Sequence, residues 1–251
     1  MSVSFSKKIT PILGAELDKL VTLPSVGRTL IGTFLLNLVL AAAFTSAGLQ
    51  GEAGTPNPLI VGLASMRYLQ AGFIILGILA ACSEYTGGQI RTTLTTIPWR
   101  SFQLSAKHLA LAIITLPAAF IIAASGVLCA FFMMKDSAVI EINAIIKVLA
   151  GATGYLTLTA LLSAATGALL RRTTPALVVL LGYYFIVSPL MKSFLPGVKT
   201  YSPDTAGSYM YTLSSSHEIS VLTPIQGAGI LLLWTLGLIT AAVVFYCKRD
   251  A

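Results

Sequence analysis

Charged side chains are scarce in this sequence. Its 251 residues include only nine Asp and Glu and sixteen Lys and Arg, whereas 56% of the residues are apolar and the mean hydropathy is +0.86. In an ordinary soluble domain about a quarter of the residues are charged. The composition therefore excludes a typical soluble protein and indicates a chain that lies largely in a lipid bilayer.

Acids and bases are also missing from the centres of the long apolar stretches. Proton relays, ion sites and metal centres inside membranes depend on such groups. The sequence contains no HExxH, GxSxG or CxxC motif, and its only histidines, His108 and His217, lie outside those centres. We therefore expect no catalytic, cofactor-binding or metal-binding residues and a chain that is not an enzyme.

A phosphate-binding GxxxxGK[ST] loop is absent too, so any ATP is expected to bind to another subunit. The three cysteines, Cys82, Cys129 and Cys247, lack the spacing of a metal site and are expected to be small buried apolar residues. The net charge of +7 does not indicate a nucleic-acid partner, because such a surface needs its basic residues clustered on a soluble face.

Long apolar runs are what the sequence does have. The six longest intervals between consecutive charged residues contain, by subtraction, 23, 16, 27, 23, 19 and 29 residues. A helix needs about 20 apolar residues to cross the hydrocarbon core. Only the second interval is shorter, and we expect its span to start near Leu63 with Arg67 at the interface. The predicted spans are residues 27–48, 63–83, 106–134, 145–170, 174–194 and 223–247.

These runs are apolar on all sides, which argues against the alternating pattern of a transmembrane barrel. Residues 1–23 carry five charges and no apolar core, so a signal peptide is not expected. The sequence thus predicts an all-α polytopic membrane protein with six transmembrane helices in one domain, residues 1–251.

The distribution of Lys and Arg predicts the orientation. With the N-terminus in the cytoplasm, eleven of the sixteen basic residues lie in or beside cytoplasmic segments, and five face the other side. Positive charge accumulates on the cytoplasmic side of membrane proteins. Both termini are therefore predicted to be cytoplasmic.

Two segments outside the spans have a pattern of their own. Residues 5–23 place Ile9, Leu13, Leu17 and Leu20 at helical spacing among charged residues, which predicts an amphipathic helix in the membrane interface, or alternatively a frayed tail. The outer loop 196–222 is rich in tyrosine, which suits an interfacial cap or a re-entrant element, with disorder as the alternative.

The connection between the second and third spans, residues 84–102, also predicts an amphipathic helix. Ile90, Leu94 and Ile97 share one helical face, while Gly88 precedes the helix and Pro98 ends it. This helix would lie on the cytoplasmic side.

Glu84, Gly88 and Arg91 form the pattern Glu-x-x-x-Gly-x-x-Arg within SEYTGGQIRTTL, followed by Pro98 and Arg100. This segment, the six spans and the aromatic-to-basic ending YCKRDA resemble the type-2 ABC exporter permeases, which are bacterial transporter membrane subunits with six spans. The chain departs from the family pattern at Gln89, where a smaller polar residue is expected, and in its second glycine, Gly87.

The resemblance implies a multi-pass subunit of the bacterial plasma membrane that pairs with a second, identical or homologous permease subunit and with two ABC ATPase subunits. ATP and Mg would bind to the ATPase subunits. In that family the segment after the second span is the coupling helix on the ATPase, and the N-terminal amphipathic helix is the connecting helix beside it. The residues implied in coupling are Glu84, Gly88, Arg91, Thr92, Thr95, Thr96, Pro98 and Arg100. A salt bridge between Glu84 and Arg91 that only stabilises the loop is the alternative.

No charged residue lies at mid-span, so the pathway is expected to be neutral and apolar, which suits an amphipathic or hydrophobic substrate, such as a peptide, drug or lipid-like molecule. The candidate pathway residues are Asn37, Phe73 and Tyr184, which the family implies because its cavity lies near spans one, two and five. Packing within the membrane is the alternative role for each. The small residues Ala160, Ser163, Ala164, Gly167 and Ala168 are expected to let helices approach closely.

Two other functions remain open. The chain could be an ATP-independent immunity or assembly protein that binds a peptide or lipid, which co-purification of an ATPase would exclude. It could also be a lipid-modifying enzyme with a site at its outer surface built from Asp204, His217 and Glu218.

The charge bias generates a topology prediction. Single cysteines introduced at Gly88 and Thr173 should react only from the cytoplasmic side, whereas cysteines at Ser137 and Ser208 should react with a membrane-impermeant maleimide in intact cells. External labelling at position 88 would contradict both the orientation and the placement of the coupling helix.

Overall fold

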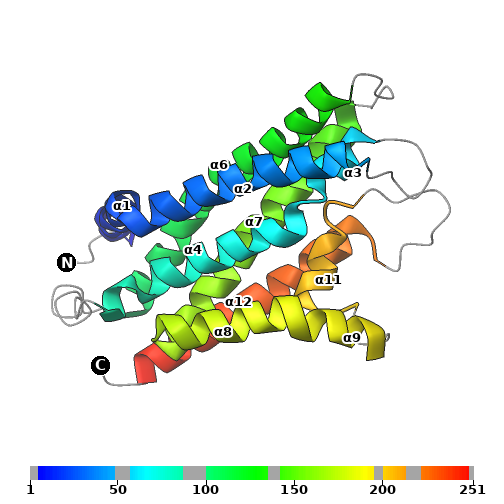
Figure 1. Cartoon of the computed structure of the whole chain (residues 1–251). Helices are drawn as coiled ribbons and strands as arrows, with labels where there is room; N and C mark the ends of the chain where they lie inside the picture. Colours follow the sequence, from blue (N-terminus) through cyan, green and yellow to red (C-terminus); the bar gives the residue numbers. More distant parts are fainter. Residues whose placement is uncertain are drawn as a thin grey trace.

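The structure of the chain, a computed structural model, describes residues 5–48, 57–86, 100–134, 142–194, 200–212 and 222–248. These residues form helices and no strands (Figure 1). Six segments are long and apolar enough to cross a membrane: Pro24–Ser46, Pro58–Ser83, Phe102–Met133, Ile142–Leu170, Thr173–Met191 and Pro224–Tyr246. The prediction of an all-α, six-span membrane protein is confirmed.

The N-terminal part of the chain contains α1 (Phe5–Thr22), α2 (Pro24–Ser46), α3 (Pro58–Leu63) and α4 (Met66–Thr86). Next come the long helices α6 (Arg100–Met133) and α7 (Ile142–Leu170), and then α8 (Thr173–Gly182), the π-helix η1 (Tyr183–Val187) and α9 (Ser188–Phe194). The last two helices are α11 (Pro203–Ser208) and α12 (Pro224–Lys248). Proline occupies the first position of α2, α3, α11 and α12, where its missing N–H has no helical partner to lose.

The second span begins earlier than the sequence predicts. It includes α3, whose start is capped by the Asn57 side chain accepting a hydrogen bond from the Leu59 backbone N–H at 3.0 Å. A cap of this kind satisfies one of the free N–H groups at a helix start. Arg67 lies in the first turn of α4 with its side chain exposed.

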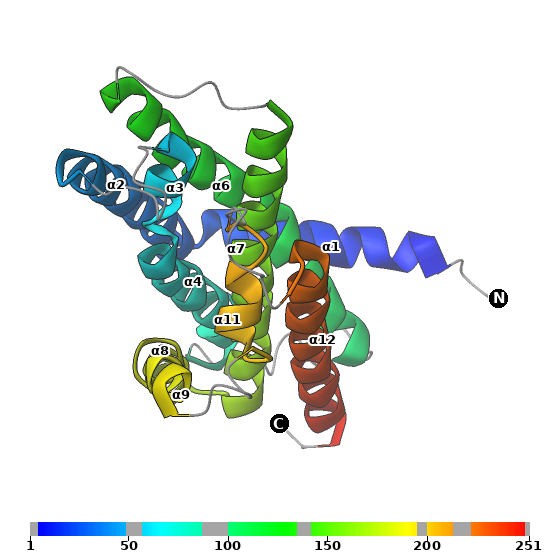
Figure 2. The same cartoon turned by 90° about the vertical axis from the view of Figure 1, so that its right-hand side faces the viewer.

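Helix α7 lies in the centre of the bundle. It packs against α4, α6, α8 and α12 (Figure 2). A methyl group added to Gly77 of α4 would overlap with the carbonyl oxygen of Ala160 in α7, and one added to Gly167 would contact Ala81 and Cys82 at 3.3 Å. The small residues of α7 therefore do let a neighbouring helix approach closely, as the sequence predicts.

Helix α1 runs across the bundle at the end where α12 finishes (Figures 1 and 2). Leu20 is buried, and Leu13 and Leu17 pack beside it against a cluster that includes Val26, Leu76 and Leu111. The predicted amphipathic helix is present, but these leucines pack on the chain's own spans.

The contact between α4 and α7 generates a stability prediction. Gly77→Ala should lower the free energy of unfolding by about 1–3 kcal/mol, because the added methyl group forces the two helices apart. Gly32→Ala in α2 is the matched control, since nothing lies within 4 Å of its added methyl group. Thermal unfolding in detergent measures both variants. Equal melting temperatures would contradict the close contact.

Candidate functional site

The predicted coupling segment connects α4 to α6. Gly88, Arg91, Thr92, Thr95, Thr96 and Pro98 lie outside the described residues, so their roles stay predictions. Glu84 lies in the last turn of α4 and Arg100 is the first residue of α6, and the structure describes the backbone but not the side chain of each. The structure does describe the two helix ends that the segment joins, which are the end of α4 and the start of α6.

These ends lie together at one end of the bundle. That end of the bundle holds the end of α4, the start of α6, the turn between α7 and α8, the end of α12 and the crosswise helix α1 (Figure 1). Because the number of spans is even, the chain enters and leaves the bundle at the same end, which places α1 and the end of α12 together. The predicted coupling segment therefore starts and finishes beside the predicted connecting helix.

Arg171 forms the turn between α7 and α8. Its φ of 54° is in the left-handed region, which residues other than glycine rarely adopt and which costs about 1–2 kcal/mol. The guanidinium carbon lies 6.0 Å from the ring centroid of Tyr85 in α4 and 6.0 Å from that of Tyr246 in α12. Cation–π attraction to two rings stabilises the strained turn and links α4, α7 and α12.

A second contact links α12 to the start of α6. The Tyr246 hydroxyl donates a hydrogen bond to Gln103 Oε1 at 3.3 Å, and both residues are buried. Lys107 and His108 are also buried one turn further along α6. With 34 residues α6 is roughly 50 Å long, far longer than the hydrocarbon core, so this polar first part can lie beyond the core.

Asn37, the first candidate for the substrate pathway, is fully buried and hydrogen-bonded within the chain. Its Nδ2 donates to the Ile122 carbonyl at 2.6 Å and to Ser125 Oγ at 3.0 Å, and its Oδ1 accepts from Ser65 Oγ at 2.8 Å. One side chain of α2 thereby connects α6 and the junction between α3 and α4. In this conformation Asn37 holds helices together, and its role in a pathway stays a prediction.

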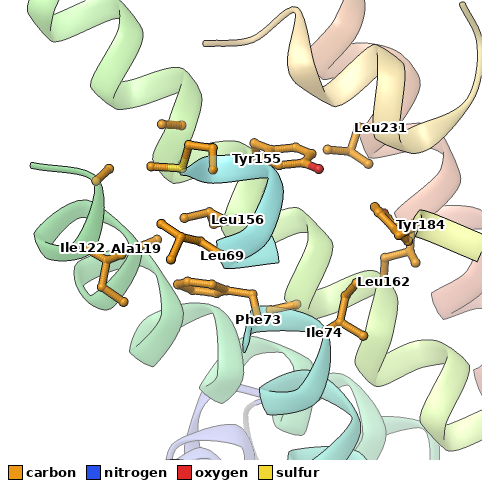
Figure 3. Close-up of a cluster of buried hydrophobic side chains, with 14 of the residues drawn as sticks. Leu69, Phe73, Ile74, Ala119, Ile122, Tyr155, Leu156, Leu162, Tyr184 and Leu231 are labelled. Carbon is orange, nitrogen blue, oxygen red and sulfur yellow. The ribbon is translucent and has the colours of Figure 1, made fainter. Parts of the chain in front are cut away.

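Phe73 and Tyr184 are likewise buried, each with 1% of its surface exposed. Phe73 of α4 points toward Ala119 and Ile122 of α6, and Tyr184 of η1 lies near Leu162 of α7 (Figure 3). The structure does not bring the three candidates to one exposed surface. A substrate could reach them only if the helices separate, so their role in transport stays a prediction.

The sequence did not indicate how the outer loop packs. Its described part, residues 200–212, is called the α11 segment here; it lies at the opposite end of the bundle from α1 and packs against the N-terminal half of α7 (Figure 2). A methyl group added to Gly207 would overlap with the ring of Tyr155, which lies roughly 20 Å along α7 from its start. A segment that reaches this far along α7 agrees with the predicted re-entrant element.

Asp204 is the buried acid of the α11 segment. Ser188 Oγ donates a hydrogen bond to Asp204 Oδ2 at 2.6 Å. Tyr155 hydrogen-bonds with Gln70, and its ring lies 5.4 Å from that of Tyr211. Desolvation, followed by the charge of Asp204, raises the pKa of the Tyr211 phenol well above its usual value. That phenol therefore stays protonated and neutral at physiological pH.

An apolar groove of about 440 Å³ runs along α12 beside the α11 segment. Its lining residues are Tyr201, Ile230, Leu233, Trp234, Gly237 and Leu238. Leu233 and Trp234 are among the exposed apolar side chains of the chain, and Trp234 Nε1 donates to the Tyr201 carbonyl at 3.0 Å. A groove of this composition suits a hydrocarbon chain rather than a polar ligand.

The described residues hold no group of three or more His, Cys, Asp or Glu that could bind a metal ion. Asp204 of the alternative lipid-modifying site is buried, while His217 and Glu218 lie outside the described residues. Comparison of the sequence with known protein families and with characterised proteins finds no match.

The hydrogen bonds of Asn37 generate a prediction that separates its two possible roles. Asn37→Ala should lower the free energy of unfolding of the isolated subunit by about 1–3 kcal/mol, because it removes the acceptor at 2.8 Å from the buried Ser65 hydroxyl group and the donor to the Ile122 carbonyl and to Ser125. Ser46→Ala is the control, since that exposed hydroxyl bonds only within its own helix. An unchanged melting temperature for Asn37→Ala would instead favour the pathway role.

Proposed function

We propose that this chain is the membrane subunit of an ATP-driven ABC exporter in the bacterial plasma membrane. It works as a dimer with a second permease subunit and with separate ATPase subunits, and it moves an amphipathic or hydrophobic substrate out of the cell. The observation that carries the proposal is the Glu84, Gly88 and Arg91 pattern in the segment that joins the second and third spans.

The helices around that segment suit the transmission of force. Closure of an ATPase dimer moves the transporter only through a connection that is short and stiff. The segment joins α4 directly to α6, and α4 packs closely on the central helix α7 through Gly77. Arg171 links the ends of α4, α7 and α12, so a movement of α4 would act on several spans together.

Helix α1 supports the same proposal. It packs against α6 and α2 through Leu20 and its neighbours and lies across the end of the bundle that carries the coupling segment. A helix in this position would be the connecting helix of the resembled family. It would join the movement of the ATPase to the first and third spans.

The apolar character of the spans supports the proposed substrate class. Buried charged residues of the described spans, such as Lys107, lie near span ends. The groove along α12 is lined by aliphatic and aromatic side chains. Both features favour a molecule with a large apolar part over an ion or a sugar.

The proposal is tested by inserting proline into the coupling segment. Thr95→Pro should cost roughly 3 kcal/mol in a helix interior and should abolish substrate-stimulated ATP hydrolysis, while the protein still inserts into the membrane. Thr95→Ala, which a helix tolerates, is the matched control and should retain activity. Each variant is co-expressed with the products of its neighbouring genes, purified in nanodiscs and assayed for ATP hydrolysis and subunit composition.

Two outcomes would contradict the proposal. If no ATPase co-purifies with the unaltered chain, the chain acts without ATP, as an immunity or assembly protein would. If the Thr95→Pro complex hydrolyses ATP and exports at the normal rate, residues 84–100 are a loop without a coupling role.

A further inference from the structure

The α11 segment is attached to the spans by polar contacts. Ser188 donates to Asp204 at 2.6 Å, and the hydroxyl groups of Tyr183 and Ser202 lie 2.6 Å apart. Hydrogen bonds between a hydroxyl group and a carboxylate are strong, but water can replace either partner when the contact opens. These bonds can therefore break and form again without the segment unfolding.

Three glycines line the contact between the α11 segment and its neighbours. Gly207 lies against the Tyr155 ring, Gly227 of α12 against the Ala206 carbonyl, and Gly151 of α7 against the Met210 carbonyl, each so closely that an added methyl group would overlap. The surfaces fit tightly, yet no side chain projects from these three positions. At these three positions no side chain of the glycine itself blocks a shift of the segment.

A buried hydroxyl group of the segment, that of Thr205, has no hydrogen-bond partner among the described residues. Buried hydroxyl groups nearly always have partners, and each missing bond is costly. A second position of the α11 segment, in which this group gains a protein or water partner, would remove that cost.

The span that holds the segment is itself irregular. Tyr183 is the first residue of the π-helix η1, and Ser188 follows its last residue. Single π-turns are rare and occur often at functional sites. Pro189 follows directly and has no N–H to donate, which weakens the regular helix at the same place. The two residues that bind the α11 segment thus lie in the least regular part of the fifth span.

We infer that the α11 segment is a movable closure over this end of the bundle and that the bond between Ser188 and Asp204 holds it shut. In the closed position it covers α7 and keeps water from the buried polar groups of Tyr155 and Tyr184. The gating role of the movement rests on the proposed exporter function, in which this end is the outer side. The closure itself does not depend on that function.

The test uses a cysteine as a reporter beneath the closure. Thr205→Cys is introduced together with Cys129→Ala and Cys247→Ala, which leaves the buried Cys82 as an internal control. The protein in nanodiscs is treated with a membrane-impermeant maleimide, and mass spectrometry follows labelling at positions 205 and 82 separately. Addition of Ser188→Ala should speed labelling at position 205 about tenfold or more, as expected for the loss of a hydrogen bond to a charged group.

Matched variants make the result specific. Ser188→Thr keeps the hydroxyl group and should restore slow labelling, and Ser193→Ala removes an exposed hydroxyl group of the same helix and should have no effect. Labelling at Cys82 should stay slow in every variant. The inference is overturned if Ser188→Ala leaves position 205 slow, or if positions 205 and 82 speed up together, because the whole bundle would then have loosened.

A second arm separates the closure from the proposed function. In the complex with its ATPase, ATP and Mg should speed labelling at position 205 relative to the complex without nucleotide. If the ATPase hydrolyses ATP and labelling does not change, the gating role is overturned. If no ATPase assembles, the exporter proposal fails, while the comparison of Ser188→Ala with Ser188→Thr still decides whether the closure exists.

Discussion

The close approach of α4 to α7 is the contact on which the rest of the bundle depends. In a bilayer, apolar side chains gain little by leaving lipid for protein, so helices associate where small residues let their backbones come near. Gly77 against Ala160 and Gly167 against Cys82 provide that approach in the second half of both helices. With this pair in place, α6 and α12 pack on the remaining sides of α7.

Polar contacts then hold the two ends of the bundle. At one end Arg171 lies over Tyr85 and Tyr246, and at the other Ser188 binds Asp204. Between the ends, most of the cluster around α7 is apolar, with Asn37 as a fully buried polar side chain between α2 and α6. Either end can therefore change while the apolar packing around α7 is retained.

The candidate site was predictable only in part. Its predicted place in the chain followed from Gly88, Pro98 and the spacing of Ile90, Leu94 and Ile97, because this pattern predicts a short amphipathic helix between two apolar runs. The contacts between the helix ends around the segment could not be predicted from the sequence. Arg171, Tyr85 and Tyr246 are far apart in sequence and meet only because three helices finish at the same end, and no local pattern marks a cation–π pair.

The sequence by itself determined the number and approximate positions of the spans, since the bilayer requires each crossing to be long and free of charge, and that requirement acts on one segment at a time. Only the tertiary structure decided which face of each span is buried. The spans are apolar on all sides, so no periodicity distinguishes a lipid-facing residue from a packed one. Asn37, Phe73 and Tyr184 therefore turned out to be interior, and the depth of α11 depended on Gly151 of α7 and Gly227 of α12 as well as on its own Gly207.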